Sequence, residues 1–224
     1  MELPDGEKDR LIKNPLYSLR VQAACPSQRV PSSQTAFRKQ VKALVDCENK
    51  AWSKALSAIS GVTFVAPTVK FYSTSTKSPC GRLNSAYPAS YCTGDRTLYF
   101  SRAAYLQGRY YRTSVAQFVM HEYAHHVQEL VSIFDSSDAL AESAAVTTRR
   151  IELQAHCMAH YAMTHSSIGF GAADRRDAEY QFDYTTDARG HGSPKAERYW
   201  GVRGLQAGNV GACNTWKAKA SVVK

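Results

Sequence analysis

The run His121-Glu122-Tyr123-Ala124-His125 combines two imidazoles and a carboxylate at a spacing that suits a hydrolytic zinc ion. Residues four apart lie one turn above each other on a helix, so both imidazole rings can reach a single metal ion there. The carboxylate of Glu122 lies beside them and can serve as the general base for a metal-activated water. The run therefore predicts a metal-dependent peptidase.

A catalytic zinc ion takes three protein ligands and keeps a position for water, so a third donor must come from elsewhere in the chain. Glu152 is our candidate, because a carboxylate in an otherwise apolar stretch is costly unless it is paired or binds a metal. One alternative is that Glu152 pairs with Arg149 or Arg150. A second is that His156 and His160 form a rival metal pair, although that pair lacks a general base.

The motif needs a helix to align its side chains, and the surrounding sequence predicts one. From Ser114 to Val131 the apolar residues fall on one broad arc, whereas His121 and His125 lie on the other side. His126 lies about 100° further round this helix, which favours a packing or hydrogen-bonding role over metal binding. A second long helix is predicted from Asp138 to Thr164, where many small residues would allow close packing against the first.

The remaining pattern predicts an α+β fold with a small, mainly antiparallel sheet packed on the motif helix and on the Glu-bearing helix. Two further helices and two strands are expected, at helices 33–60 and 195–207 and at strands 62–72 and 96–101. Residues 1–32 contain four prolines and are predicted to be an extended N-terminal arm. We expect residues 33–224 to form a single zinc metallopeptidase domain.

The six cysteines do not form a CxxC pair, which argues against a structural zinc ribbon and favours disulfides. The simplest local pairings are Cys25 with Cys47, Cys80 with Cys92, and Cys157 with Cys213. Disulfides persist in oxidising compartments, so we expect a secreted or cell-envelope protein. Buried thiols of a cytosolic enzyme are the alternative.

The N-terminus is polar and acidic and shows no apolar signal region, and no stretch is long enough to span a bilayer. We expect that an export signal or anchor has been removed and that Met1 is an added start. Contact with a membrane would then require that missing segment.

The formal net charge is +9, but the lysines and arginines are spread along the chain instead of forming a basic run. We therefore expect no specific nucleic-acid partner. The positive electrostatic field of such a chain would attract anionic cell-envelope polymers and acidic substrates equally well.

The negative charge that develops on a peptide carbonyl during hydrolysis requires a hydrogen-bond donor. His191 is our candidate for this catalytic role, because it lies in the Gly-rich loop Arg189–Pro194, a type of segment that often carries functional groups. The alternatives are that His191 only hydrogen-bonds the next helix, or that Tyr184 or another tyrosine supplies the donor.

Three separated motifs resemble one known family. They are His121-Glu122-Tyr123-Ala124-His125-His126-Val127-Gln128, Glu152-Leu153-Gln154-Ala155-His156-Cys157 and His191-Gly192-Ser193, and Tyr91-Cys92 followed by Thr97-Leu98-Tyr99-Phe100 also fits. Over about its last 150 residues the chain is similar to the bacterial family named putative neutral zinc metallopeptidases, whose architecture resembles that of the gluzincins.

The resemblance implies a zincin-like fold that holds Zn²⁺ through His121, His125 and Glu152, with Glu122 as the catalytic base. It also implies that the strand containing Leu98–Phe100 is an edge strand, to which an extended peptide substrate adds as a further strand.

At one position the chain departs from the family, because His156 stands where an Asp usually orients a zinc-binding imidazole. A neutral histidine supplies no negative charge, so we expect weaker zinc binding or activity than in relatives. Two function classes follow: a zinc-dependent peptidase, and a zinc-bearing non-catalytic binding module or pseudoenzyme. Glu122 favours the peptidase, since a binding module has no chemical need for a general base.

Overall fold

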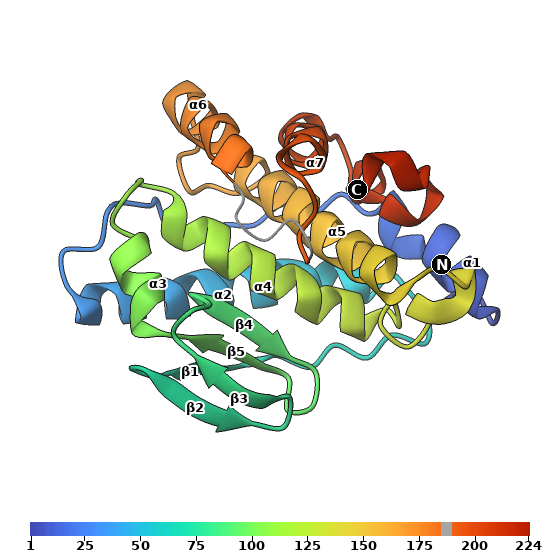
Figure 1. Cartoon of the computed structure of the whole chain (residues 1–224), viewed down its shortest axis with the longest axis horizontal. Coiled ribbons are helices and arrows are strands. Elements are labelled where there is room, and N and C mark those ends of the chain that lie inside the picture. The colour runs from blue at the N-terminus through green and yellow to red at the C-terminus, as the bar shows by residue number, and fades with distance from the viewer. Residues whose placement is uncertain (185–189) are drawn as a thin grey trace.

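The computed structural model describes residues 1–184 and 190–224. Its core is built on four long helices: α2 (Gln34–Leu56), α4 (Ser114–Leu130), α5 (Ala144–Thr164) and α7 (Pro194–Gln206). The motif helix α4 packs against both α2 and α5, and α7 packs on α5 (Figure 1). The two helices predicted to carry the metal-binding residues therefore lie side by side at the centre of the molecule.

Serine side chains cap the N-termini of two of these helices. The hydroxyl oxygen of Ser33 accepts a hydrogen bond from the backbone N–H of Ala36 at the start of α2, and Ser193 does the same for Ala196 at the start of α7. Such caps satisfy backbone donors that have no partner inside the helix. Gly61 follows α2 with a φ of +84°, a conformation that glycine adopts without strain.

The second predicted helix starts later than expected. Residues 138–140 belong to a short 3₁₀ turn, η2 (Ser137–Leu140), and Ala141 then has a left-handed backbone with φ 52° and ψ 34°. A left-handed residue cannot continue an α-helix, so α5 begins only at Ala144.

Several shorter elements were not predicted. They are α1 (Glu7–Ile12), α3 (Arg102–Gln107), α6 (Ala172–Gln181) and the 3₁₀ turns η1 (Pro15–Ser18), η3 (Phe182–Tyr184), η4 (Val210–Cys213), η5 (Thr215–Lys217) and η6 (Ala220–Val222). Helices of about two turns are too short to show a 3.6-residue period. Helix α6 is mostly polar and buries only Asp174 and Ala178, so it has no apolar stripe that the sequence could reveal.

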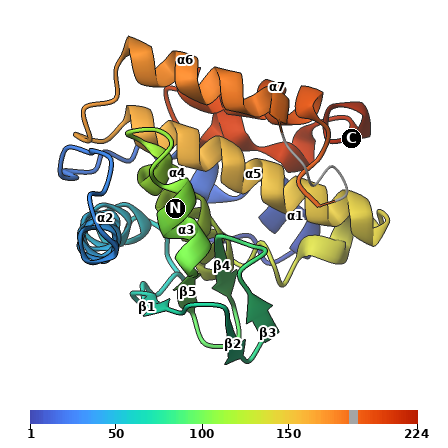
Figure 2. The same ribbon diagram turned by 60° about the vertical axis from the view of Figure 1, so that its left-hand side comes forward.

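The strands form a three-stranded sheet of order β1-β5-β4 and a separate hairpin of β2 and β3. Their bounds are β1 Thr68–Phe71, β2 Ser75–Ser78, β3 Gly81–Asn84, β4 Ala89–Cys92 and β5 Thr97–Phe100. Strand β1 runs parallel to β5, whereas β4 and β5, and β2 and β3, pair antiparallel. The strands lie on one side of the α4–α5 pair, and α6 and α7 lie on the opposite side (Figure 2).

Two expectations about the sheet are wrong. The predicted strand 62–72 is paired only from Thr68, directly after Pro67, which has no N–H to donate to a ladder. Strand β5, which contains Leu98–Phe100, is the central strand and is buried at all four positions, so it is no edge strand. The edge strand next to α4 is β4, which lies between the two predicted strands, where no strand was expected.

The first 32 residues are extended only in part. They include α1 and η1, and their Leu11 and Leu16 are fully buried in the main core. Asn14 anchors the segment, since its side-chain N–H donates to the carbonyl of Val131 at the end of α4 at 3.0 Å. The proposed boundary at residue 33 stays a prediction.

All three predicted disulfides are present: Cys25–Cys47, Cys80–Cys92 and Cys157–Cys213. They join the N-terminal segment to α2, the β2–β3 hairpin to β4, and α5 to η4. This full use of the cysteines is typical of proteins that fold in an oxidising environment. Within residues 1–184 and 190–224, no helix has the length and apolar character needed to cross a membrane.

Candidate metal centre

Helices α4 and α5 bring three potential metal ligands together. The Nε2 atoms of His121 and His125 lie 3.2 Å apart, and each lies 3.2 Å from Oε2 of Glu152. The two histidines are on successive turns of α4, and Glu152 reaches them from the neighbouring α5. The three atoms form a nearly equilateral triangle, which we call the ligand triangle.

The ligand triangle has dimensions that suit zinc. Zn–N and Zn–O bonds of about 2.0–2.1 Å at tetrahedral angles separate neighbouring ligand atoms by about 3.4 Å. The observed separations of 3.2 Å agree with one face of such a tetrahedron. Three lone-pair atoms this close also repel one another unless a cation or a proton lies between them. The residues present therefore fit a zinc ion.

The electrostatics of the triangle favour a bound positive charge. Burial raises the pKa of Glu152, but His125 and the other imidazoles outweigh burial and hold that pKa well below its usual value. Burial alone would lower the pKa of His125, whereas the carboxylate of Glu152 raises it to about 9. The metal-free protein thus holds a proton where a metal ion would replace it.

Gln128, a residue without a predicted role, fixes the orientation of His125. Oε1 of Gln128 lies 2.8 Å from Nδ1 of His125, and the side-chain amide of Gln128 donates to the carbonyl of Ile151 and to Oε1 of Gln154. The side-chain N–H groups of Gln128 are used in these two bonds, to Ile151 and Gln154. The side-chain oxygen of Gln128 must therefore accept a hydrogen bond from Nδ1–H of His125. The Nε2 lone pair of His125 then faces the ligand triangle.

The same network continues away from the site. The side-chain amide of Gln154 donates to the hydroxyl of Tyr17 and to the carbonyl of Cys213. Gln128 and Gln154 are both fully buried. The hydrogen bonds that fix the tautomer of His125 therefore extend to Tyr17 of η1 and to the C-terminal segment that is held by the Cys157–Cys213 disulfide. The only signal in the sequence was a glutamine three residues after His125, a spacing at which helix side chains are neighbours.

Glu122 lies beside the triangle without belonging to it. Its side chain is buried and borders both cavities that open at the site. Burial raises the pKa of Glu122, while His121 and His125 act in the opposite direction. His191 also lies at the site, with its Nε2 atom 3.3 Å from Oε2 of Glu152. Of the loop predicted to carry His191, Arg189 lies outside the described residues.

Comparison with known proteins agrees with this geometry. A family model described as "Putative neutral zinc metallopeptidase" matches residues 16–183, which is most of the chain. The chain belongs to this family. The match extends further toward the N-terminus than the sequence motifs indicated, and it includes all of η1 except Pro15 and the whole of α2.

Two relatives illustrate the reach of the family. The uncharacterized protein Rv2575 of Mycobacterium tuberculosis H37Rv is 27% identical over 193 residues, which cover 69% of this chain and 64% of the relative. The uncharacterized protein YpfJ of Escherichia coli K12 is 28% identical over 182 residues, covering 70% of this chain and 63% of the relative. The chain thus spans slightly less than two thirds of these relatives. No solved structure matches it.

In this member of the putative neutral zinc metallopeptidase family, the alternative for Glu152 was an ion pair with Arg149 or Arg150. The contacts of both arginines argue against that pair. Arg150 pairs with Glu142, and Arg149 donates to the carbonyl of Val223. Neither arginine is therefore the partner that the alternative required.

His126 has a hydrogen-bonding role and is not among the three candidate metal ligands. Its Nδ1 atom lies 2.9 Å from the hydroxyl of Tyr91 on β4, and its Nε2 atom lies 2.7 Å from the carbonyl of Val65. Burial lowers the pKa of His126 to about 4, so the ring is neutral. His126 thus fastens the edge strand to the motif helix.

His156, at the position where the family usually carries Asp, is not the partner of a ligand-triangle histidine in this structure. Its Nδ1 atom lies 3.0 Å from Oε2 of Glu197 on α7. The orienting partner of His125 is instead Gln128, from the motif helix itself. The expectation that His156 weakens the site by failing to orient a ligand therefore loses its structural basis.

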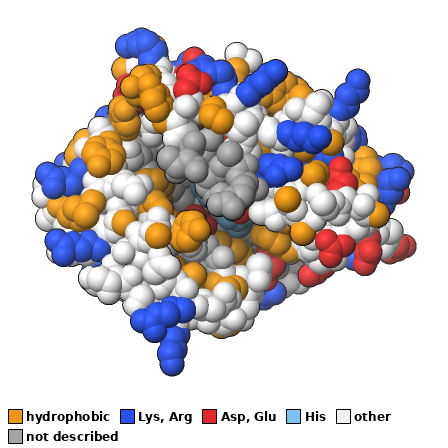
Figure 3. All heavy atoms as spheres, in the orientation of Figure 1, with side chains coloured by type: hydrophobic (Ala, Val, Ile, Leu, Met, Phe, Trp, Pro, Cys, Tyr) orange, Lys and Arg blue, Asp and Glu red, His pale blue; other side chains and the backbone are white. Residues whose placement is uncertain are grey.

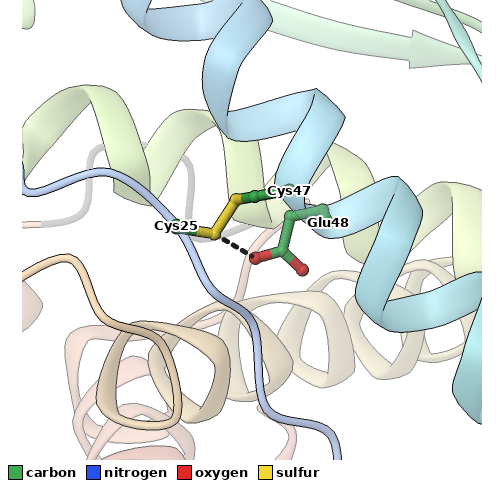
Figure 4. Close-up of side chains that lie close together, drawn as sticks. All are labelled: Cys25, Cys47 and Glu48. Atoms are coloured by element: carbon green, nitrogen blue, oxygen red, sulfur yellow. Dashed lines mark hydrogen bonds between the residues drawn. A yellow bond between two sulfur atoms is a disulfide. The ribbon is translucent and has the colours of Figure 1, made fainter.

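A second cluster of metal-binding residue types lies apart from the site. Cys25, Cys47 and Glu48 are close together and buried. Figure 4 shows that the two sulfur atoms are joined as a disulfide, with a carboxylate oxygen of Glu48 3.6 Å from Sγ of Cys25. A disulfide sulfur is a poor metal ligand compared with a thiolate. Glu48 instead accepts a hydrogen bond from Nε1 of Trp52 at 2.9 Å.

The ligand triangle lies at the bottom of a hollow in the protein surface. Two cavities of about 440 and 540 Å³ meet there, and both are bordered by Tyr87, Ala89, His121, Glu122 and His191. Figure 3 shows histidine atoms at the bottom of this hollow, near the centre of the face viewed in Figure 1. The edge strand β4 forms one wall, so a chain lying along β4 would pass the triangle.

Proposed function

We propose that the protein is a zinc-dependent peptidase in which His121, His125 and Glu152 hold the metal and Glu122 is the general base. The observation that carries the proposal is the ligand triangle with sides of 3.2 Å, bordered by a buried carboxylate that takes no part in it. This donor set, with three protein ligands and an adjacent carboxylate, is the one that zinc hydrolases use.

Zinc bound there would polarise a substrate carbonyl and acidify a water molecule. Glu122 accepts the proton of the attacking water and later delivers it to the departing amine. The burial of Glu122 supports this role, because a desolvated carboxylate binds a proton more strongly. His191 donates a hydrogen bond to the negative charge that develops on the carbonyl oxygen.

We propose that the substrate is an extended peptide or protein segment that lies along β4. Among the described strands β4 pairs only with β5, and its residues Ala89, Ser90 and Tyr91 border the hollow. Backbone groups of a substrate can therefore pair with those of residues 89–92. This assignment replaces the earlier one to Leu98–Phe100, which occupy the centre of the sheet. Anionic cell-envelope polymers remain a proposed partner of the basic surface.

The experiment is cleavage of a diverse peptide mixture, read by mass spectrometry, with zinc-loaded protein and its Glu122→Gln variant in parallel. We expect cuts with the native protein and none with the variant, although both bind one equivalent of zinc and unfold at similar temperatures. Loss of the cuts on removal of zinc by a chelator would link them to the metal. A folded, zinc-loaded native protein that cuts no peptide would instead favour the non-catalytic binding module.

A further inference from the structure

The cavity of about 440 Å³ on the α7 side of the site has an unusual charge balance. The chain has 28 lysines and arginines against 19 acidic residues. The described residues that line this cavity nevertheless include no lysine or arginine, and they include two carboxylates, Glu122 and Glu197. In Figure 3 the basic side chains of this face stand outside the hollow. Among the described side chains of the lining, a cation therefore meets carboxylates and no lysine or arginine, and Glu197 is the carboxylate that does not adjoin the proposed metal position.

Glu197 is the carboxylate of this cavity that the proposed mechanism does not use. It lies in the first turn of α7, is 7% exposed, and accepts a hydrogen bond from Nδ1–H of His156 at 3.0 Å. Burial alone would raise the pKa of Glu197, but His156 and the more distant His191 and His121 outweigh burial and lower it. One hydrogen bond leaves most of the acceptor capacity of an ionised carboxylate unused.

Two histidines, His156 and His160, lie beside Glu197 in the lining of the cavity. Nδ1–H of His160 donates to the carbonyl of His156 at 2.8 Å, and the two imidazole rings lie 4.5 Å apart. Both Nδ1 atoms therefore act as hydrogen-bond donors. Both Nε2 atoms are buried, and neither has a hydrogen-bond partner among the described residues. These two atoms are closed off from the cavity, and Nε2 of His156 lies against Gly201, so the group at this end that can receive a cation is the carboxylate of Glu197.

The rest of the lining suits the long apolar stem of a basic side chain. Phe118 and Phe182 border the cavity, and the ring of Phe182 packs edge-on against both histidines at 5.1 and 4.8 Å. Lysine and arginine bury their methylene groups along such surfaces while the charged end remains hydrogen-bonded. The lining also includes the amide side chains of Gln107 and Gln117.

We propose that this cavity is the subsite that selects a lysine or arginine side chain of the substrate next to the scissile bond, with Glu197 as the residue that binds the cation. The proposal rests on the proposed peptidase function and adds a substrate class to it. The cavity begins at His121 and Glu122, so a side chain within it belongs to a residue adjacent to the hydrolysed bond.

The test uses matched peptides that differ at one position, with lysine, norleucine or glutamate there. Norleucine retains the apolar stem of lysine but lacks the ammonium group. We expect kcat/KM for the lysine peptide to exceed that for the norleucine peptide at least tenfold, with the glutamate peptide lowest, since a desolvated charge pair contributes discrimination of about this size. Glu197→Gln should abolish the difference between lysine and norleucine while retaining cleavage of the norleucine peptide, which also shows that the variant is folded.

Glu179→Gln is the matched control, because it removes a carboxylate of α6 that does not line the cavity. It should retain the preference for lysine. Equal cleavage of the lysine and norleucine peptides by native protein would overturn the subsite and leave the peptidase standing. A preference for lysine that persists in Glu197→Gln would overturn the role of Glu197.

Binding of the same peptides to the zinc-loaded Glu122→Gln variant separates the subsite from catalysis. Tighter binding of the lysine peptide that depends on Glu197 would support the subsite even if the native protein cuts nothing. Metal analysis provides a further check. A second zinc equivalent that is lost in His160→Asn would show that the Nε2 atoms of His156 and His160 hold a metal, and it would overturn the proposal.

Discussion

The role of Gln128 can be tested by replacing it with leucine. Gln128 is fully buried, its oxygen lies 2.8 Å from Nδ1 of His125, and its amide donates to the carbonyl of Ile151 and to Gln154. Leucine has a similar size but can neither accept nor donate a hydrogen bond. The variant therefore removes the group that holds the His125 ring in the tautomer required for metal binding, and it leaves both ligand histidines in place.

Two effects of different size are expected. Loss of a hydrogen-bonded partner of a metal-ligating histidine typically costs 10-fold to 100-fold in metal affinity, which is about 1.4–2.7 kcal/mol. The metal-free protein is also destabilised, because Nδ1 of His125 and Oε1 of Gln154 each lose a buried partner. At about 1–3 kcal/mol for each unsatisfied group, the free energy of unfolding should fall by about 2–6 kcal/mol.

Zinc affinity is measured by competition with a chromogenic chelator, and stability by urea unfolding of the metal-free protein. Gln117→Leu is the control, since Gln117 is a half-buried glutamine of the same helix that borders the cavity. It should leave both quantities near their native values. A Gln128→Leu protein that binds zinc as tightly as the native protein would refute the idea that Gln128 positions His125.

Three further predictions concern stability. Burial raises the pKa of Glu48 from 4.5 to about 7, so its contribution to stability is fully present below pH 4.5 and is lost as the pH rises toward 7. At about 1.4 kcal/mol per pKa unit the loss is about 3 kcal/mol, and urea unfolding from pH 4.5 to 8 should show a shallower decline for Glu48→Gln. Gly204→Ala should cost about 1–3 kcal/mol in the same assay, because its Cβ would lie 2.2 Å from the carbonyl oxygen of Cys157, whereas Gly208→Ala, with nothing within 4 Å, should cost little. Replacing both Cys157 and Cys213 by alanine should lower the free energy of unfolding by about 4 kcal/mol through loss of their long-range cross-link, and an unchanged value would contradict that estimate.

The sequence predicted the local parts of the candidate site well. The spacing of His121 and His125 fixes their alignment once the segment is helical, and the observed α4 runs from Ser114 to Leu130. The role of Glu152 as a partner of the two histidines and the three cysteine pairings also followed from simple arguments about cost and proximity. Burial of an unpaired charge is costly wherever it occurs, so such residues can be recognised before their partners are known.

Other parts of the site depended on contacts between distant segments. Strand β4 became the edge strand because β1 pairs with the other side of β5, and strand order is set by packing and not by the strand's own residues. Nothing near Glu197 in the sequence indicated that its carboxylate would meet His156. That contact requires the close approach of α5 and α7, which Gly204 permits by lacking a side chain where α7 meets Cys157.

The sequence by itself determined which residues can do chemistry and which face of one helix presents them, because these properties follow from side-chain type and from the 3.6-residue turn. Tertiary structure decided what surrounds them. Gln128 accepts a hydrogen bond from His125, His191 lies against Glu152, and Glu197 lines the cavity of about 440 Å³ on the α7 side of the site. The contacts of His191 and Glu197 join residues far apart in the chain, and they exist only when whole helices pack at one particular distance and angle. The bond between Gln128 and His125 is local, but the partners that set the direction of the Gln128 amide lie on α5.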